Sequence, residues 1–358
     1  MKFTIDKTDL DRALSSLSPF LDKRGDSLTS NFFLTVKDDS LTIKATNLKI
    51  GLSVRIDSIL VEREGRVLVD GTRLLQVFKP LKRDNVTLEQ IGNELIVKQG
   101  KSKLVVKTHS NTDGFYKFPT IEDMSRLPFN GELLREGFDN IIPSIDGNSP
   151  KYELTGGLIS ILDNKINFVS TDTKRLTVVE ESISEDATDL ELIIPRPAIV
   201  EIPKLFDGDI EFIYNEEFVI IESRDKFFFT KLVSGKYPNW KRIVPTQLKY
   251  NFTFQKNEMM ENLKLLSSIT SEVKVTLDKN RISFETLDYS NLNSKAETSI
   301  DINLEIEETL EFGANSRFII DFLNSIDDDS FKLGFNEVNR PFILQSKNLK
   351  TVIMPINL

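Results

Sequence analysis

A short stretch from Gln99 to Ser102 (QGKS) is the part of the sequence that comes closest to a phosphate-binding motif. A P-loop needs a further glycine five positions before Gly100 and a helix after it, so that backbone N–H groups and the helix dipole face the phosphates. Leu95 occupies the earlier position, and the LVVK that follows is typical of a strand. We therefore reject a nucleotide-binding loop.

Residues that support metal or covalent chemistry are scarce. The chain of 358 residues has no cysteine and a single histidine, His109, which excludes disulfides, thiolate nucleophiles and multi-histidine metal sites. The acidic clusters at 305–308 and 327–329 lack calcium-loop spacing, and solvated loops or helix ends are favoured over paired catalytic carboxylates. Gly156–Gly157 lacks the downstream glycine of a dinucleotide site and indicates a turn or bulge. We expect no catalytic residue, metal or cofactor.

The charge distribution and the apolar pattern limit the partners and the location. Residues 1–119 carry 20 basic and 15 acidic side chains, whereas residues 120–245 and 246–358 are both net acidic, within a total of -9. The total argues against indiscriminate nucleic-acid binding, but the first third is basic. No run of 18 apolar residues occurs, and the N-terminal MKFTIDKTDLDRAL carries three aspartates where a signal peptide would be apolar. We expect a soluble, cytoplasmic protein.

Two motifs suggest a binding surface instead of a reaction. In FVSTDTKRLTVV (168–179) a polar block interrupts a strand pattern. In SGKYPNWKRIVP (234–245) the only tryptophan, Trp240, stands between two prolines and beside Lys241 and Arg242. Proline stiffness, an aromatic ring and a guanidinium together are typical of a linker with a binding edge. Packing of Trp240 into the joint between two domains is the alternative.

These motifs belong to a repeat of about 120 residues, which the order of elements reveals. Each third opens with a strand and an amphipathic helix, continues with strands that close on related turns containing Thr46, Thr171 or Thr286, and then has a second amphipathic helix and a hairpin. Gly92–Asn93, Asn215 and Asn336 supply hairpin turn residues that tolerate positive φ. The sequence predicts an α+β fold of three topologically similar domains, 1–119, 120–245 and 246–358, each with two helices packed on β-sheets.

Four segments in this order resemble the bacterial β sliding clamp family, the processivity subunit of DNA polymerase III. They are STDTKRLTVV (170–179), IIPRPAIVEI (193–202), the KYPNWKRIVP linker and the terminal TVIMPINL. The resemblance covers essentially the whole chain. It implies a non-catalytic homodimer, joined head to tail as a ring of six domains around double-stranded DNA, with contacts that are independent of DNA sequence.

The resemblance also implies residue roles. The apolar part of the dimer interface would be Leu104 and Val106 with Leu265 and Leu266, and we expect the basic first third to face the acidic last third. Arg24, Tyr152 and Arg196 would face DNA, and Arg73 on a predicted helix is a further candidate. A groove would receive short linear peptides of the replicative polymerase, the clamp loader and repair proteins. The groove residues would be Leu154, Thr171, Thr173, Lys174, Arg175, Leu176, Pro238, Arg242, Ile243, Val352, Met354, Pro355, Ile356 and Leu358, with Arg175 and Arg242 at its rim.

The sequence departs from the family pattern at two places. Thr173–Lys174 stands where Gly-His usually precedes Arg-Leu, and Asn357 stands where the penultimate residue is commonly arginine. Peptide preference is therefore left open. Two other functions remain alternatives, a scaffold of β-rich repeats that binds partners without encircling DNA and a carboxylate-dependent hydrolase.

Overall fold

The computed structural model describes residues 1–22, 27–109, 111–127, 129–183, 189–287 and 295–358. The chain divides into two compact units. The first comprises Met1–Arg135 and Glu201–Leu232, and the second comprises Glu136–Val200 and Val233–Leu358. Two of the three boundaries along the chain fall within the helices α3 (Gly131–Ile141) and α4 (Arg196–Leu205), and the third follows Leu232.

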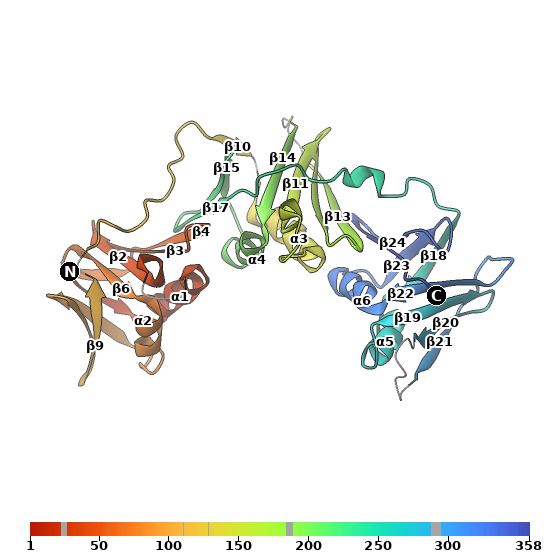
Figure 1. Ribbon diagram of the computed structural model, residues 1–358. Helices are drawn as coiled ribbons and strands as arrows, with labels where there is room; N and C mark the ends of the chain where they lie inside the picture. The colour runs from red at the N-terminus through yellow and green to blue at the C-terminus, as the bar shows by residue number, and fades with distance from the viewer. Residues whose placement is uncertain (23–26, 110, 128, 184–188, 288–294) are drawn as a thin grey trace. The chain divides into compact units, whose positions relative to one another are not determined.

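One antiparallel sheet of 13 strands runs through the first unit, in the order β10-β15-β16-β17-β4-β3-β2-β6-β9-β8-β7-β1-β5 (Figure 1). Its strands are β1 (Lys2–Asp6), β2 (Asn31–Lys37), β3 (Ser40–Thr46), β4 (Ile50–Ile56), β5 (Ile59–Arg63), β6 (Gly65–Asp70), β7 (Asn85–Ile91), β8 (Glu94–Gln99), β9 (Ser102–His109), β10 (Ser125–Leu127), β15 (Glu211–Tyr214), β16 (Phe218–Glu222) and β17 (Lys226–Lys231). The helices α1 (Lys7–Leu17) and α2 (Gly71–Phe78) pack against each other.

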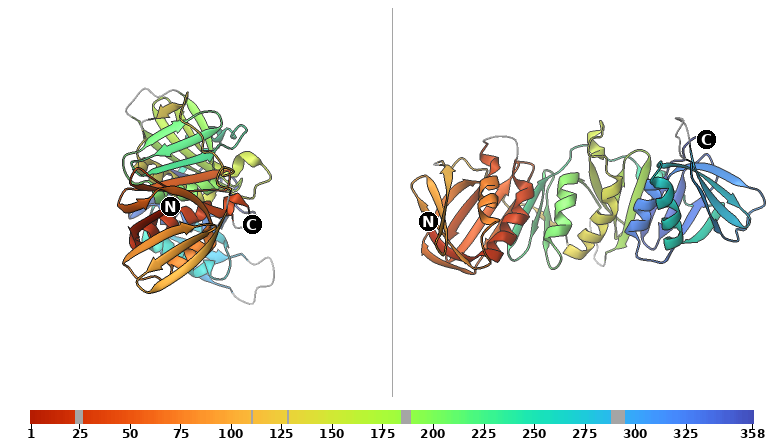
Figure 2. Two further views of the ribbon diagram at one scale, coloured as in Figure 1. Left: turned by 90° about the vertical axis from the view of Figure 1, so that its left-hand side faces the viewer. Right: turned by 90° about the horizontal axis from the view of Figure 1, so that it is seen from below.

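The second unit contains a sheet of eight strands and a sheet of four, in the orders β14-β11-β12-β13-β25-β24-β23-β18 and β21-β20-β19-β22. Its strands are β11 (Gly156–Leu162), β12 (Lys165–Thr171), β13 (Arg175–Ser182), β14 (Leu190–Pro195), β18 (Tyr250–Gln255), β19 (Glu272–Asp278), β20 (Arg281–Thr286), β21 (Glu297–Asp301), β22 (Leu310–Asn315), β23 (Ser330–Phe335), β24 (Phe342–Ser346) and β25 (Leu349–Ile353). The helices α5 (Lys256–Ser267) and α6 (Ser316–Ser325) lie side by side, as Figure 2 shows.

The helices form where the apolar spacing predicts them, and short polar side chains begin them. Asp6 caps α1 by accepting the Thr8 N–H over 2.7 Å, and Asp70 caps α2 by accepting the Arg73 N–H over the same distance. Such caps satisfy N–H groups that have no partner within the helix. Pro203 lies inside α4, where it has no N–H to donate to the carbonyl four residues before it, and the helix ends two residues later at Leu205.

The hairpin turns agree with the sequence in position but not always in mechanism. Gly92 has a φ of 56° between β7 and β8, as expected. Asn215 does not have a positive φ, and its side chain instead accepts the N–H groups of Glu217 and Phe218. Residues 99–102 form the turn between β8 and β9, with Gly100 at a φ of 56°, and so do not form a phosphate loop.

Candidate functional site

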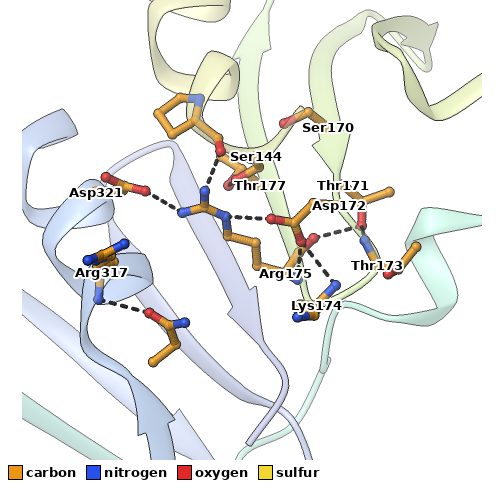
Figure 3. A network of polar contacts seen from close by, with 12 residues as sticks. Ser144, Ser170, Thr171, Asp172, Thr173, Lys174, Arg175, Thr177, Arg317 and Asp321 are labelled. Atoms are coloured by element: carbon orange, nitrogen blue, oxygen red, sulfur yellow. Dashed lines mark hydrogen bonds and ion pairs between the residues drawn. The ribbon is translucent and has the colours of Figure 1, made fainter. Parts of the chain in front are cut away.

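The polar block of FVSTDTKRLTVV forms a tight turn between β12 and β13, residues 171–175, which we name the polar turn (Figure 3). Thr171 Oγ1 donates to the Arg175 carbonyl over 2.6 Å, and Asp172 Oδ1 accepts the Lys174 and Arg175 N–H groups over 3.0 and 2.9 Å. Thr173 takes a φ of 73°, a conformation that residues with a side chain rarely adopt. The strand pattern breaks here because these side chains satisfy the backbone of the turn.

The Arg175 guanidinium points into the fold. It donates to Asp172 over 3.1 Å and to Asp321 on α6 over 2.6 Å, as Figure 3 shows. It also donates to the Pro143 carbonyl. Its central carbon lies 4.2 Å from the centroid of the Phe318 ring. The residue is only 8% exposed. Three acceptors hold the group below the surface, and its role at the rim of a groove stays a prediction.

An apolar floor lies beside the polar turn. Leu154, Leu176 and Val352, three of the expected groove residues, belong to one buried cluster with Tyr237 and Trp240. Leu176 and Val352 are direct partners in β13 and β25, so their side chains lie on the same face of the sheet. The cluster joins the strands, the linker and the C-terminal strand, which lie far apart in the sequence.

Trp240 serves the packing role that the sequence left as an alternative. Its side chain is 9% exposed within the cluster, while Lys241 lies 5.5 Å from its ring. Tyr237 is also buried there, and burial raises the pKa of its hydroxyl above the ordinary value. Sequence reasoning did not assign Tyr237 to the floor. The only signal in the sequence was the position of Tyr237 in the proline-containing linker, two residues before Asn239.

The C-terminal tail forms one side of this surface. The Met354 N–H donates to the Lys174 carbonyl over 2.9 Å, and the Ile356 N–H donates to the Gly313 carbonyl over 2.9 Å. Two backbone bonds therefore hold the tail while the Met354 side chain stays 48% exposed. Leu358 is exposed beyond the second bond.

The remaining expected groove residues lie on the linker and the tail of the same compact unit. Pro238 and Pro355 are half-buried, and Arg242 and Ile243 are exposed at the end of a short 3-10 helix, Trp240–Arg242. The surface thus combines an apolar floor, exposed apolar side chains and backbone groups. A flexible methionine at such a surface suits several ligands, because its thioether adapts to different shapes.

The expected DNA-facing residues are exposed where the structure describes them. Arg73 lies on α2, Arg196 is the first residue of α4, and Tyr152 lies on the 3-10 helix Tyr152–Leu154. The Arg196 N–H donates to the carbonyl of Thr155 over 3.2 Å, which links α4 to the segment that carries Tyr152. Arg24 lies outside the described residues.

Two of the four expected dimer-interface residues are buried by their own chain. Val106 on β9 is 3% exposed and Leu266 on α5 is fully buried, and their place in a dimer interface stays a prediction. Leu104 is half-buried and Leu265 is 57% exposed. Along a helix, adjacent residues point about 100° apart, which explains why Leu265 and Leu266 differ.

No group of three potential ligands among histidine, aspartate and glutamate gathers in the part of the chain that the structure describes. Within those same residues, the helices are all too short or too polar to cross a membrane.

Comparison with known proteins gives matches over nearly the entire sequence. Models of the DNA polymerase III beta subunit match as its N-terminal domain at residues 1–119, its central domain at 129–239 and its C-terminal domain at 241–357. The beta sliding clamp of Helicobacter pylori strain J99 is 35% identical over 375 residues, which cover 100% of both chains. That of Vibrio cholerae is 24% identical over 381 residues, again with full coverage.

Solved structures of beta clamps also match this chain over its full length. A Helicobacter pylori beta clamp bound to a DNA ligase peptide has a TM-score of 0.92 and 34% identity, covering 100% of each chain. The DNA polymerase III subunit beta of Pseudomonas aeruginosa has a TM-score of 0.92 at 20% identity and the same coverage, which shows a shared fold.

Proposed function

The chain belongs to the family of bacterial beta sliding clamps, the beta subunits of DNA polymerase III, and we therefore propose that two copies close head to tail into a ring of six domains around duplex DNA. Members of this family are non-catalytic processivity factors. The observation that carries the proposal is the match of the N-terminal, central and C-terminal clamp domains, in order, along one chain. We propose domain limits of 1–119, 120–245 and 246–358 and a location in the cytoplasm, with the DNA.

Confinement explains how an acidic protein can hold an acidic polymer. A closed ring cannot leave a circular duplex sideways, so only a few cations are needed to guide the DNA through it. Phosphate contacts carry no sequence information and weaken with salt. We assign this role to Arg73, Arg196 and Arg24, together with the exposed Tyr152. The net charge of -9 limits adhesion and so favours sliding.

The ring would close through β9 of one copy, whose residues 102–107 pair with β8 but not with β6, and α5 of another. Leu104 and Leu265 supply the apolar contact in this proposal, since Val106 and Leu266 support the two surfaces from below. Residues 1–119 carry a net positive charge and residues 246–358 a net negative charge, which favours a head-to-tail contact over a head-to-head one. A heterologous contact of this kind gives a ring when its rotation closes.

The surface between the polar turn, the linker and the C-terminal tail would bind partner peptides. The related clamp of Helicobacter pylori binds a DNA ligase peptide. By the same mode we propose short linear peptides of the replicative polymerase, the clamp loader and repair proteins as ligands here. An apolar peptide side chain would lie on Leu176 and Val352, with Met354 adapting over it. Arg175 would act indirectly, by holding the polar turn in place.

Retention on DNA tests the ring. The protein is mixed with nicked circular DNA after opening by a clamp loader, and the complex is separated by gel filtration in high salt. We expect it to stay on circles and to leave within minutes of cutting the DNA once. Equal loss from circular and linear DNA would support a scaffold that does not encircle DNA and would refute the ring.

Removal of Met354–Leu358 tests the groove. A labelled peptide of DNA ligase is titrated by fluorescence anisotropy against the shortened chain and against Tyr152→Ala, a matched change outside the groove. We expect the truncation to weaken binding at least tenfold and Tyr152→Ala to leave it unchanged. Undiminished affinity of the truncated chain would place the peptide elsewhere.

A further inference from the structure

The turn between β3 and β4 repeats the polar turn almost bond for bond. Thr46 Oγ1 donates to the Ile50 carbonyl over 2.8 Å, and Asn47 Oδ1 accepts the Ile50 N–H over 3.0 Å. Leu48 has a φ of 72°, against 73° at Thr173. The first compact unit therefore contains a turn of the same shape as the one beside the proposed groove.

The neighbouring strand also follows the same course. The Lys231 N–H donates to the Lys49 carbonyl over 2.9 Å, just as the Met354 N–H donates to the Lys174 carbonyl over 2.9 Å. β17 pairs with β4 as β25 pairs with β13. Each unit thus has a surface built from a turn, an adjacent strand end and a following segment of chain.

Side chains give the surface of the first unit a different character. The Phe118 ring meets the Phe229 ring edge-on at a centroid distance of 4.8 Å, and Tyr116 stacks on Phe229 at 5.9 Å. Phe229 covers Gly51, where a side-chain carbon would lie 2.2 Å from the ring. These rings fill the space that corresponds to the apolar floor, and the open space lies beside them.

That open space is a pocket of about 580 Å³ with an excess of positive charge. Its cations are Lys44, Arg55, Lys117, Arg224 and Lys226, and its carboxylates are Glu222 and Asp225. Asp57 neutralises Arg55 at 2.7 Å and Asp225 lies 3.4 Å from Lys226. Among the described residues, no carboxylate forms an ion pair with the three other cations.

Lys44 is the most constrained of these cations. It pairs with Ser53 across β3 and β4, and Ser53 pairs with Phe227 across β4 and β17, so the three side chains lie on one face. Lys44 Nζ lies 5.0 Å from the centroid of the Phe118 ring, and the residue is half-buried. Burial lowers the pKa of Lys44, because the charged form loses water without gaining a counter-charge. An anion bound beside Lys44 would supply the missing counter-charge.

We propose that this pocket binds an acidic peptide segment of a partner protein, with a carboxylate at Lys44 and a neighbouring aromatic side chain against Phe118 and Phe227. The two rings are 6.1 Å apart by their centroids and form an apolar wall next to the ammonium group. Lys117 and Arg224 are exposed at the edge of the pocket, where they meet further carboxylates along the same peptide. The volume lies within the usual range for ligand sites, about 300–1,000 Å³.

The test uses the full chain and a fluorescein-labelled peptide of sequence DEFDE, followed by fluorescence anisotropy. Lys44→Gln is expected to weaken binding about tenfold, the effect of one charge-assisted hydrogen bond. Lys49→Gln removes the same charge from an exposed position in the turn between β3 and β4 and should change affinity less than about twofold. An NQFNQ peptide should not bind. Chemical acetylation of Lys44, followed by mass spectrometry, should slow when DEFDE is present, whereas acetylation of Lys49 should not.

Three outcomes would overturn the proposal. The first is equal binding of DEFDE to the wild type and Lys44→Gln, and the second is an equal loss in Lys49→Gln, which would indicate general attraction of anions. The third is binding of phenylacetate as tight as that of DEFDE, which would make the pocket a site for small aromatic acids. The chain that lacks Met354–Leu358 should bind DEFDE normally, so a failure of the groove and a failure of this pocket are distinguishable.

Discussion

The contact between Arg175 and Asp321 offers a direct test of how the polar turn is held. The change Arg175→Met keeps most of the side-chain volume but leaves Asp172, Asp321 and the Pro143 carbonyl without their donor. Removing one partner of a buried ion pair costs about 3–5 kcal/mol. In Asp321→Asn the guanidinium keeps its other two acceptors, and the Asp321 side chain is 38% exposed, so a loss of about 1–2 kcal/mol is expected.

Urea unfolding followed by Trp240 fluorescence measures both effects, because the only tryptophan lies in the cluster beside the polar turn. With a slope of about 2 kcal/mol per molar urea, Arg175→Met should lower the midpoint by about 1.5–2.5 M and Asp321→Asn by about 0.5–1 M. The double variant should lose less than the sum of the two, because both changes break the same contact.

Lys174→Met is the matched control, since Lys174 is exposed and adjacent in the same turn. Its stability should change by less than about 0.5 kcal/mol. If Arg175→Met unfolded within about 0.3 M urea of the wild type, or if the two losses were additive, the guanidinium would not be what fastens the turn to α6.

Three further predictions concern the interface, the tail and the charged pocket. Leu265→Asp should give monomers by light scattering, since it places a charge on an exposed apolar contact without disturbing the core, and an unchanged dimer mass would refute the interface. Gly313→Ala should weaken groove-peptide binding severalfold, because the new carbon would lie 2.5 Å from the Ile356 carbonyl oxygen in the C-terminal tail. Gly208→Ala is the control, since its new carbon meets nothing within 4 Å, and it should have no effect. Lys44 has a lowered pKa when folded, so the folded state binds fewer protons than the unfolded state between that pKa and 10.5, and stability should rise with pH there. Lys44→Met should raise the melting temperature at neutral pH and flatten this rise, and an unchanged pH profile would contradict it.

Local features of the fold could be predicted from the sequence because their causes lie within a few residues. The stripe Leu10, Ala13, Leu14 and Leu17 specifies the buried face of α1 wherever that helix packs. The hydrogen bonds of the polar turn all fall within residues 171–175, so a break in the strand pattern is visible in the sequence. Even so, the sequence suggested a positive φ at Asn215, where the side chain makes the turn instead.

Only the tertiary structure decided which partners the side chains contact. Arg175 and Asp321 are 146 residues apart, and no spacing rule connects them. Periodicity indicates that Val106 and Leu266 are apolar positions on a strand and a helix, but only packing shows that their own chain buries them. The excess of cations around Lys44 arises because β3, β4 and β17 bring together residues from distant segments. A helix or a tight turn depends on interactions between residues that are close in the sequence. Burial and ion pairing depend instead on which distant residues the folded chain brings together.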